Sequence, residues 1–195
     1  MKKRKTKIVR KTRETQITLE LDLNGTGKTI IECPLGFWSH MLNLLSFFSG
    51  FDLTVKAAGD VEIDDHHLVE DLGICLGEAL KKALGDRAGI RRFGSALVPM
   101  DETLVQTVVD ISGRPFLGFN IPIIRNRKEY SLIENLQEFC RGFSNHAGVN
   151  LHFVLFSGEN THHICEAVFK SLGLALKDAV KRERRGVSST KGKFD

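Results

Sequence analysis

Apolar and polar residues alternate strictly over residues 17–23, as they do in a strand with one buried face. The turn residues 24–27 follow, so the pattern predicts a hairpin whose second strand covers residues 28–33. The remaining elements predicted for the first half are a helix over residues 37–49, one strand or a strand pair over 51–63, and a helix over 66–84.

The second half of the chain repeats this order. Its predicted elements are strands over residues 97–110 and 116–121, a helix over 132–145, a strand over 149–156 and a helix over 162–182. Each half therefore has the order β-β-α-β-α, and we divide the chain into residues 1–92 and 93–182. Helices on one face of a mixed sheet give a two-layer α+β unit, made twice.

Both long helices carry an apolar stripe at helical spacing, which predicts that one face of each is buried. The stripe residues are Leu72, Cys75, Leu76, Ala79, Leu80 and Ala83 in one helix, and Val168, Leu172, Ala175, Leu176 and Ala179 in the other. Gly77 and Gly173 lie on or beside these faces and would let helices approach closely. Packing explains these positions, and we attach no chemistry to them.

An internal repeat underlies the two helices. Residues 66–84 and 162–180 agree at nine of nineteen positions without gaps, and both segments begin with the pattern His-His-x-x-Glu. The first copy is His66, His67 and Glu70, and the second is His162, His163 and Glu166. Imidazole and carboxylate groups are metal ligands, so the repeat indicates chemistry as well as architecture.

The spacing permits each histidine to share a helix face with its glutamate, because residues three or four apart are neighbours. Adjacent residues diverge by about 100° around a helix. Two histidines in sequence therefore do not reach one ion from regular helix, and two motifs suggest two metals completed by residues from elsewhere. The set contains no cysteine, which favours Mn, Fe, Co or catalytic Zn over a structural zinc finger. The alternative is that these residues only cap two helix starts.

Composition limits the other possibilities. The chain has 195 residues, 42% of them hydrophobic, and a net charge of +4 that comes largely from its two ends. The apolar run over residues 35–51 is too short and too polar to cross a bilayer. The basic start leads into polar residues, so no secretory signal is predicted. The four cysteines form no C-x-x-C pair, which is typical of reduced thiols and predicts a cytoplasmic protein. Short basic ends are usually solvated, so neither a nucleic-acid nor a membrane partner is predicted.

Several longer motifs, in order, are similar to those of the imidazoleglycerol-phosphate dehydratase family. They are residues 52–60 continuing through Ile63-Asp64-Asp65-His66-His67 to Gly73, then Arg91-Arg92-Phe93-Gly94, Pro99-Met100-Asp101-Glu102-Thr103-Leu104, Asp110-Ile111-Ser112-Gly113-Arg114-Pro115, and Gly158-Glu159-Asn160-Thr161-His162-His163 through Lys170. The resemblance covers residues 10–191.

The resemblance implies a lyase of histidine biosynthesis that converts D-erythro-imidazole-glycerol phosphate to imidazole-acetol phosphate and water. It also implies a duplicated half like domain 2 of ribosomal protein S5, and a shell of 24 subunits. Each active site in such a shell holds two Mn²⁺ at subunit contacts. The ligands implied are His40, His66, His67, Glu70, Glu138, His162, His163 and Glu166. Glu138 stands where the family often has histidine, and Ser39 stands where it usually has aspartate.

The resemblance also assigns catalytic and substrate-binding residues. Direct catalytic roles fall on Glu14, as the acid/base group, and on His67 and His163. The residues expected to bind the substrate are Glu14, His40, Arg92, Arg114, Lys170, Ser189, Thr190 and Lys191. The last three belong to a tail, residues 183–195, that is expected to fold over the phosphate.

Two other function classes remain open at the level of sequence. A metal-storing assembly without catalysis would take up metal and show no turnover. An S5-like RNA-binding module would need a basic, aromatic face, whereas the basic residues gather at the ends and the chain has one Trp and one Tyr.

Overall fold

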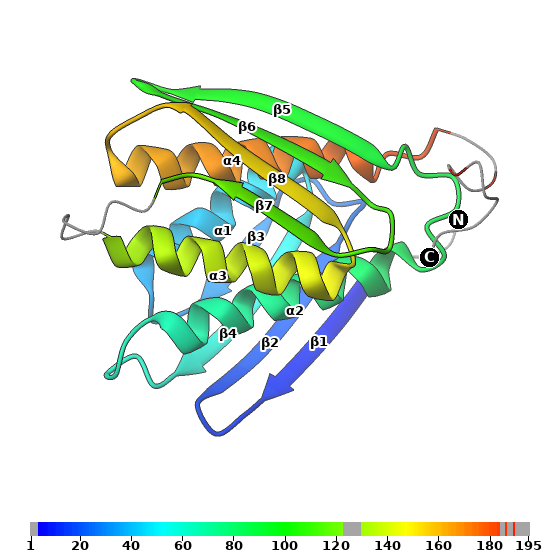
Figure 1. Ribbon diagram of the computed structural model, residues 1–195. Helices are drawn as coiled ribbons and strands as arrows, with labels where there is room; N and C mark the ends of the chain where they lie inside the picture. The colour runs from blue at the N-terminus through cyan, green and yellow to red at the C-terminus, as the bar shows by residue number, and fades with distance from the viewer. Residues whose placement is uncertain (1–3, 123–129, 184–185, 187–188, 190–195) are drawn as a thin grey trace.

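The computed structural model describes residues 4–122, 130–183, 186 and 189 (Figure 1). Its first half contains β1 (Lys5–Lys11), β2 (Thr15–Asp22), β3 (Thr29–Glu32), α1 (Gly36–Ser49), β4 (Asp52–Gly59) and α2 (His66–Leu84). Its second half contains β5 (Phe93–Met100), β6 (Thr103–Asp110), β7 (Phe116–Asn120), α3 (Tyr130–Ala147), β8 (Asn150–Ser157) and α4 (Thr161–Ala179).

The two halves have the same topology. One sheet has the strand order β1-β2-β4-β3 and the other β5-β6-β8-β7. In both, the last pair is parallel and the other pairs are antiparallel. The predicted α+β class with duplicated halves and mixed sheets is therefore confirmed.

Each half has a strand that was not predicted separately, and residues 51–63 contain the single strand β4 rather than a pair. β1 was hidden in the basic N-terminal segment because only one of its residues, Ile8, is buried. Charged residues are common on such edge strands, where they discourage pairing with other chains. In the second half, the single strand predicted over residues 97–110 is the hairpin of β5 and β6, which turns at Asp101 with a positive φ of 49°.

The hairpin predicted between residues 17–23 and 28–33 is wrong. β2 and β3 both pair with β4, which lies between them. The Asp52 carboxylate explains the crossing, because its Oδ1 accepts hydrogen bonds from the backbone N–H groups of Thr26 (2.8 Å) and Lys28 (2.9 Å). These bonds hold the loop across the start of β4.

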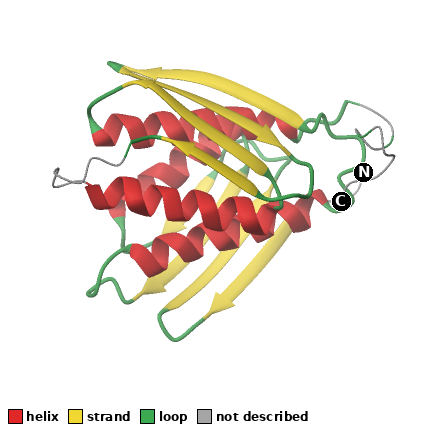
Figure 2. Cartoon of the chain, in the orientation of Figure 1, coloured by secondary structure: helices red, strands yellow, loops and turns green. Residues whose placement is uncertain are grey.

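The four helices lie between the two sheets (Figures 1 and 2). α1 packs on α4, and α2 packs on α3, so both helix contacts join one half to the other. The apolar stripes predicted on α2 and α4 are buried throughout. A membrane-spanning helix is not among the helices of the described residues, since none is long and apolar enough.

Glycines set the distance between the paired helices. A Cβ added at Gly73 of α2 would lie 2.2 Å from the Phe139 carbonyl oxygen of α3, and one at Gly77 would lie 2.5 Å from the Phe143 carbonyl oxygen. On the other pair, Gly173 of α4 faces the Leu45 carbonyl oxygen of α1 at 2.9 Å. The predicted close approach at Gly77 and Gly173 is confirmed.

Substituting Gly73 with alanine is expected to destabilise the protein by about 1–3 kcal/mol, because the obstacle is a helix backbone that cannot rotate away. The matched control is Gly36→Ala in α1, where an added Cβ meets nothing within 4 Å. Urea denaturation of both variants gives the comparison. Equal midpoints would contradict the close contact of α2 with α3.

Candidate metal centre

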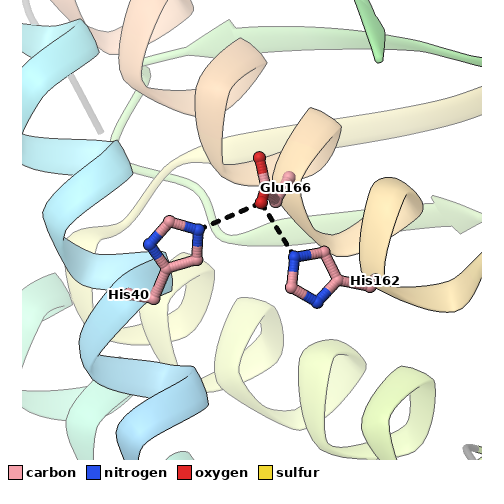
Figure 3. A group of neighbouring side chains, drawn as sticks. All are labelled: His40, His162 and Glu166. Carbon is pink, nitrogen blue, oxygen red and sulfur yellow. Dashed lines mark hydrogen bonds and ion pairs between the residues drawn. The ribbon is translucent and has the colours of Figure 1, made fainter. Parts of the chain in front are cut away.

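Three potential ligand atoms, supplied by α1 and α4, lie close together. The Nε2 atoms of His40 and His162 lie 3.0 Å and 2.8 Å from the same oxygen, Oε1 of Glu166 (Figure 3). The ligand atoms of these residues all lie within 4.8 Å of one another, the one such group of three among the described residues. Two imidazoles and a carboxylate aimed at one point form a partial coordination sphere.

Local structure fixes the positions of these side chains. The Asn160 side chain caps α4 and accepts the backbone N–H groups of His162 (2.9 Å) and His163 (3.4 Å). The histidine pair therefore lies in the first turn, and Glu166 follows His162 by one turn on the same face. His40 comes from α1, which the contact at Gly173 brings close to α4.

The Glu166 carboxylate is held in its ionised form. Burial raises its pKa, but hydrogen bonds from Lys170, His40 and His162 outweigh burial and lower the pKa to about 2. Lys170 Nζ lies 2.7 Å from the other carboxylate oxygen, Oε2. A buried carboxylate that stays charged beside two imidazole nitrogens suits a divalent cation.

A second group of predicted ligands lines a cavity of about 520 Å³ beside α2 and α3. His66 and Glu138 both face this cavity, and His66 Nε2 lies 4.0 Å from Glu70 Oε2. The remaining lining residues are Asp64, Asp65, Ser131, Glu134, Asn135 and Gln137. Glu138 forms an ion pair with Arg141 on its own helix.

This cavity is the counterpart of the His40 group in the other pair of helices. His40 lies ten residues before Gly50, which ends α1, and Glu138 lies ten residues before Gly148, which follows α3. His66 and Glu70 correspond to His162 and Glu166 in the repeated motif. Glu138 therefore occupies the position of His40, and each pair of helices carries the same three ligand positions.

The second histidine of each motif contacts other carboxylates. His67 Nδ1 lies 3.0 Å from Asp60 Oδ2 and 4.0 Å from Glu14 Oε2, and the bond with Asp60 raises the pKa of His67. His163 Nδ1 lies 2.8 Å from Glu102 Oε2. Bonds from His163 and from the backbone of Asn160 lower the pKa of Glu102 to about 2.

Sequence reasoning did not assign a role to Asp60 or Glu102. Both lie in stretches that carried the family resemblance, Asp60 six residues before the first histidine pair and Glu102 in the stretch Pro99–Leu104. The only signal was an acidic residue within a stretch that resembles the family, and acidic residues are common on protein surfaces. Ser39 does not take a comparable role, since its Oγ donates to the Leu35 carbonyl of its own helix at 3.0 Å.

The predicted phosphate-binding arginines lie at one end of the second sheet, and Glu102 and His163 lie at the other. Arg92 precedes β5 and makes two bonds with Asp110, from Nε at 2.6 Å and from Nη2 at 3.0 Å. Arg114 follows the end of β6 in the loop before β7. Of the tail residues, Ser189 is described, and Thr190 and Lys191 lie outside the described residues.

Known proteins resemble this chain over nearly its whole length. The profile of the family described as "Imidazoleglycerol-phosphate dehydratase" matches residues 33–176. The chain belongs to the imidazoleglycerol-phosphate dehydratase family. A relative of that name from Desulforudis audaxviator is 51% identical over 190 residues, or 97% of each chain. Another, from Acetivibrio thermocellus, is 50% identical over 191 residues, covering 97% of this chain and 98% of the relative.

Solved structures of this family have the same fold. The enzyme from Pyrococcus furiosus gives a TM-score of 0.83 at 39% identity, covering 95% of this chain and 99% of that one. The enzyme from Staphylococcus aureus gives 0.81 at 36% identity, covering 92% and 99%. Membership of the imidazoleglycerol-phosphate dehydratase family confirms the family resemblance, and with it the prediction that the chain is an enzyme.

Proposed function

We propose that the chain dehydrates D-erythro-imidazole-glycerol phosphate to imidazole-acetol phosphate in histidine biosynthesis, with two Mn²⁺ per active site. The convergence of His40, His162 and Glu166 on one point carries this proposal. These three side chains would bind one of the metal ions used in this reaction. Conversion of that substrate by purified protein supplied with Mn²⁺ tests the activity, and metal uptake without conversion would favour storage instead.

The duplicated fold supports two ions rather than one. His40, His162 and Glu166 would contribute to one ion, and Glu138, His66 and Glu70 to the other. His67 and His163 complete the eight proposed ligands, each with Nδ1 already occupied by a carboxylate, so that Nε2 is the nitrogen that would bind metal. Imidazole and carboxylate donors together suit Mn²⁺.

Removing Glu138 tests the second ion. Glu138→Ala is expected to weaken one of two Mn²⁺ sites by about 10-fold or more, because a charged ligand is lost. The matched control is Glu134→Ala, one turn earlier in the same cavity. Glu134 corresponds to Gly36 in the other half, which offers no ligand, so this variant should bind Mn²⁺ as the parent does. Calorimetric titration of metal-free protein measures both, and equal losses would refute the symmetry argument.

The active site is proposed to form between copies of the chain. The eight residues of β5 span about 25 Å at roughly 3.3 Å per residue. Arg92 precedes one end of β5, and Glu102, the partner of His163, follows the other. One small substrate cannot reach both ends, so a neighbouring copy would supply either the phosphate arginines or the metal ligands.

Exposed apolar side chains support an assembly, which we propose to be the 24-subunit shell. Phe93, Leu97 and Phe116 are each more than half exposed on strands of the second sheet. Phe93 and Leu97 share the exposed face of β5, and contiguous exposed apolar surface is typical of protein contacts.

In the proposed mechanism, the chain supplies groups that bind, orient and exchange protons. Arg92 and Arg114 would bind the phosphate, since the planar guanidinium matches phosphate oxygens. Lys170 and the tail residues Ser189, Thr190 and Lys191 would complete the substrate contacts. When bound, the two ions would hold the substrate's imidazolate ring and stabilise negative charge during elimination.

Glu14 is the proposed acid/base group. Its carboxylate is 57% exposed and lies 4.0 Å from His67 Nδ1, which places it beside a ligand and leaves it open to a substrate. The proton to be removed sits on the carbon next to the ring, and the departing hydroxide needs a proton donor. His67 and His163 would act as ligands of the ions that hold the substrate's ring beside this group.

A further inference from the structure

The two halves bind the second histidine of the motif through carboxylates at different positions. In the first half, His67 Nδ1 is bonded to Asp60, which directly follows β4. In the second half, His163 Nδ1 is bonded to Glu102, which lies in the hairpin between β5 and β6. A duplicated fold would be expected to use the same position twice.

Comparing the halves shows which residues stand at the unused positions. Glu14 and Glu102 are counterparts, because each directly precedes a buried threonine that begins a strand, Thr15 of β2 and Thr103 of β6. Asp60 corresponds to Gly158, since each directly follows the strand before its motif. The first half therefore has carboxylates at both positions, and the second half has one.

Only one of the two first-half carboxylates lies within hydrogen-bond distance of His67 Nδ1. Asp60 Oδ2 lies at 3.0 Å, within hydrogen-bond distance, and Glu14 Oε2 lies at 4.0 Å, beyond it. In the second half, Gly158 has no side chain, and Glu102 bonds to His163 and also accepts the Asn160 N–H at 3.0 Å. Glu102 thus joins the hairpin to the start of α4.

We infer that Asp60 and Glu102 are positioning residues that hold His67 and His163 with Nε2 directed toward metal, and that Asp60 thereby leaves the Glu14 carboxylate free for proton transfer. An Nδ1–H donated to a carboxylate fixes both the tautomer and the ring orientation of a ligand histidine. The second part rests on the proposed function, in which Glu14 is the acid/base group. In the first half, Asp60 makes the bond to the motif histidine that Glu102 makes in the second half, so Glu14 does not have to make it.

A double-mutant cycle on Mn²⁺ affinity and turnover tests this inference. Glu102→Ala is expected to weaken Mn²⁺ binding about 10–100-fold, because His163 loses its Nδ1 partner. Asp60→Ala is expected to keep Mn²⁺ affinity within a few-fold, since Glu14 can move onto His67 Nδ1. Its kcat should fall as far as that of Glu14→Gln, with KM little changed.

The double variant Asp60→Ala/Glu14→Ala separates the outcomes. It leaves His67 without a carboxylate partner, so Mn²⁺ binding should weaken about 10–100-fold, although Glu14→Ala alone should not weaken it. Glu62→Ala, an exposed residue in the same loop as Asp60, is the control for folding and should match the parent. Circular dichroism checks that each variant is folded.

The positioning role of Asp60 and Glu102 would be overturned if the double variant and the Glu102→Ala variant are folded and still bind Mn²⁺ as tightly as the parent. A loss of affinity in Asp60→Ala alone, with no further loss in the double variant, would overturn the exchange with Glu14. Should the parent bind two Mn²⁺ without converting substrate, the proposed function fails, while the affinity measurements still decide the positioning role.

Discussion

Protein stripped of metal by a chelator is expected to lose its conversion of imidazole-glycerol phosphate by about 10³-fold or more, and Mn²⁺ is expected to restore it. The carbon-bound proton next to the imidazole ring is not acidic by itself. Metal stabilisation of the developing charge contributes several kcal/mol, and each 1.36 kcal/mol corresponds to a factor of ten in rate. Initial rates before and after adding Mn²⁺, together with the metal content of the same samples, give the measurement.

A matched pair of histidine variants assigns this effect to the proposed centre. His162→Ala removes a nitrogen that points to Glu166 Oε1, so it should lower both metal content and rate. His146→Ala removes a histidine whose Nδ1 is bonded to the Gly142 carbonyl of its own helix at 2.9 Å, so both quantities should stay at the parent level. Full turnover in metal-free protein would reject the proposed function.

Replacing Glu14 with glutamine is expected to lower kcat about 10²–10⁴-fold while Mn²⁺ content stays unchanged, because a general acid/base group typically contributes this much. Glutamine keeps the size of the side chain and removes its ability to exchange a proton. Glu14 is not bonded to a ligand nitrogen, since its carboxylate lies 4.0 Å from His67. Steady-state kinetics with a metal count on the same preparation separates the chemical role from metal binding.

Glu32→Gln provides the control for this substitution. Glu32 lies on β3, is 61% exposed and pairs with Lys56 on the neighbouring strand, and it is neither a predicted ligand nor a predicted substrate-binding residue. An exposed ion pair of this kind contributes about 1 kcal/mol at most. The control should retain the parent rate, and a Glu14→Gln enzyme as fast as this control would remove Glu14 from the mechanism.

Local patterns predicted the elements that have a strong periodicity of their own. The strand at residues 17–23 and the helices that begin at the two histidine pairs appear within a few residues of their predicted bounds. β1 was missed, because its outward side chains are mostly basic and only Ile8 is buried. The pairing of β2 with β3 was predicted wrongly, because the Asp52 side chain that redirects the loop comes from a segment much later in the chain.

The candidate site shows the same division. The repeated motif predicted the ligand types, and the structure brings His40 to His162 and Glu166, and His66 into one cavity with Glu138. It also shows that one chain keeps these groups apart from Arg92 and Arg114, at the far end of the sheet. Glu102 was unassigned because it meets His163 only after a hairpin and a helix start have packed together.

By itself, the sequence determined the α+β class, the duplication, the family and the kinds of side chain available for chemistry. These follow from periodicity and from residue identity, which are local properties of the chain. Only the tertiary structure decided which strands pair, which helices from different halves share a ligand group, and which carboxylate holds each histidine. Those contacts join residues far apart in sequence, and their geometry depends on how closely glycine lets the helices approach and on how each loop is hydrogen-bonded.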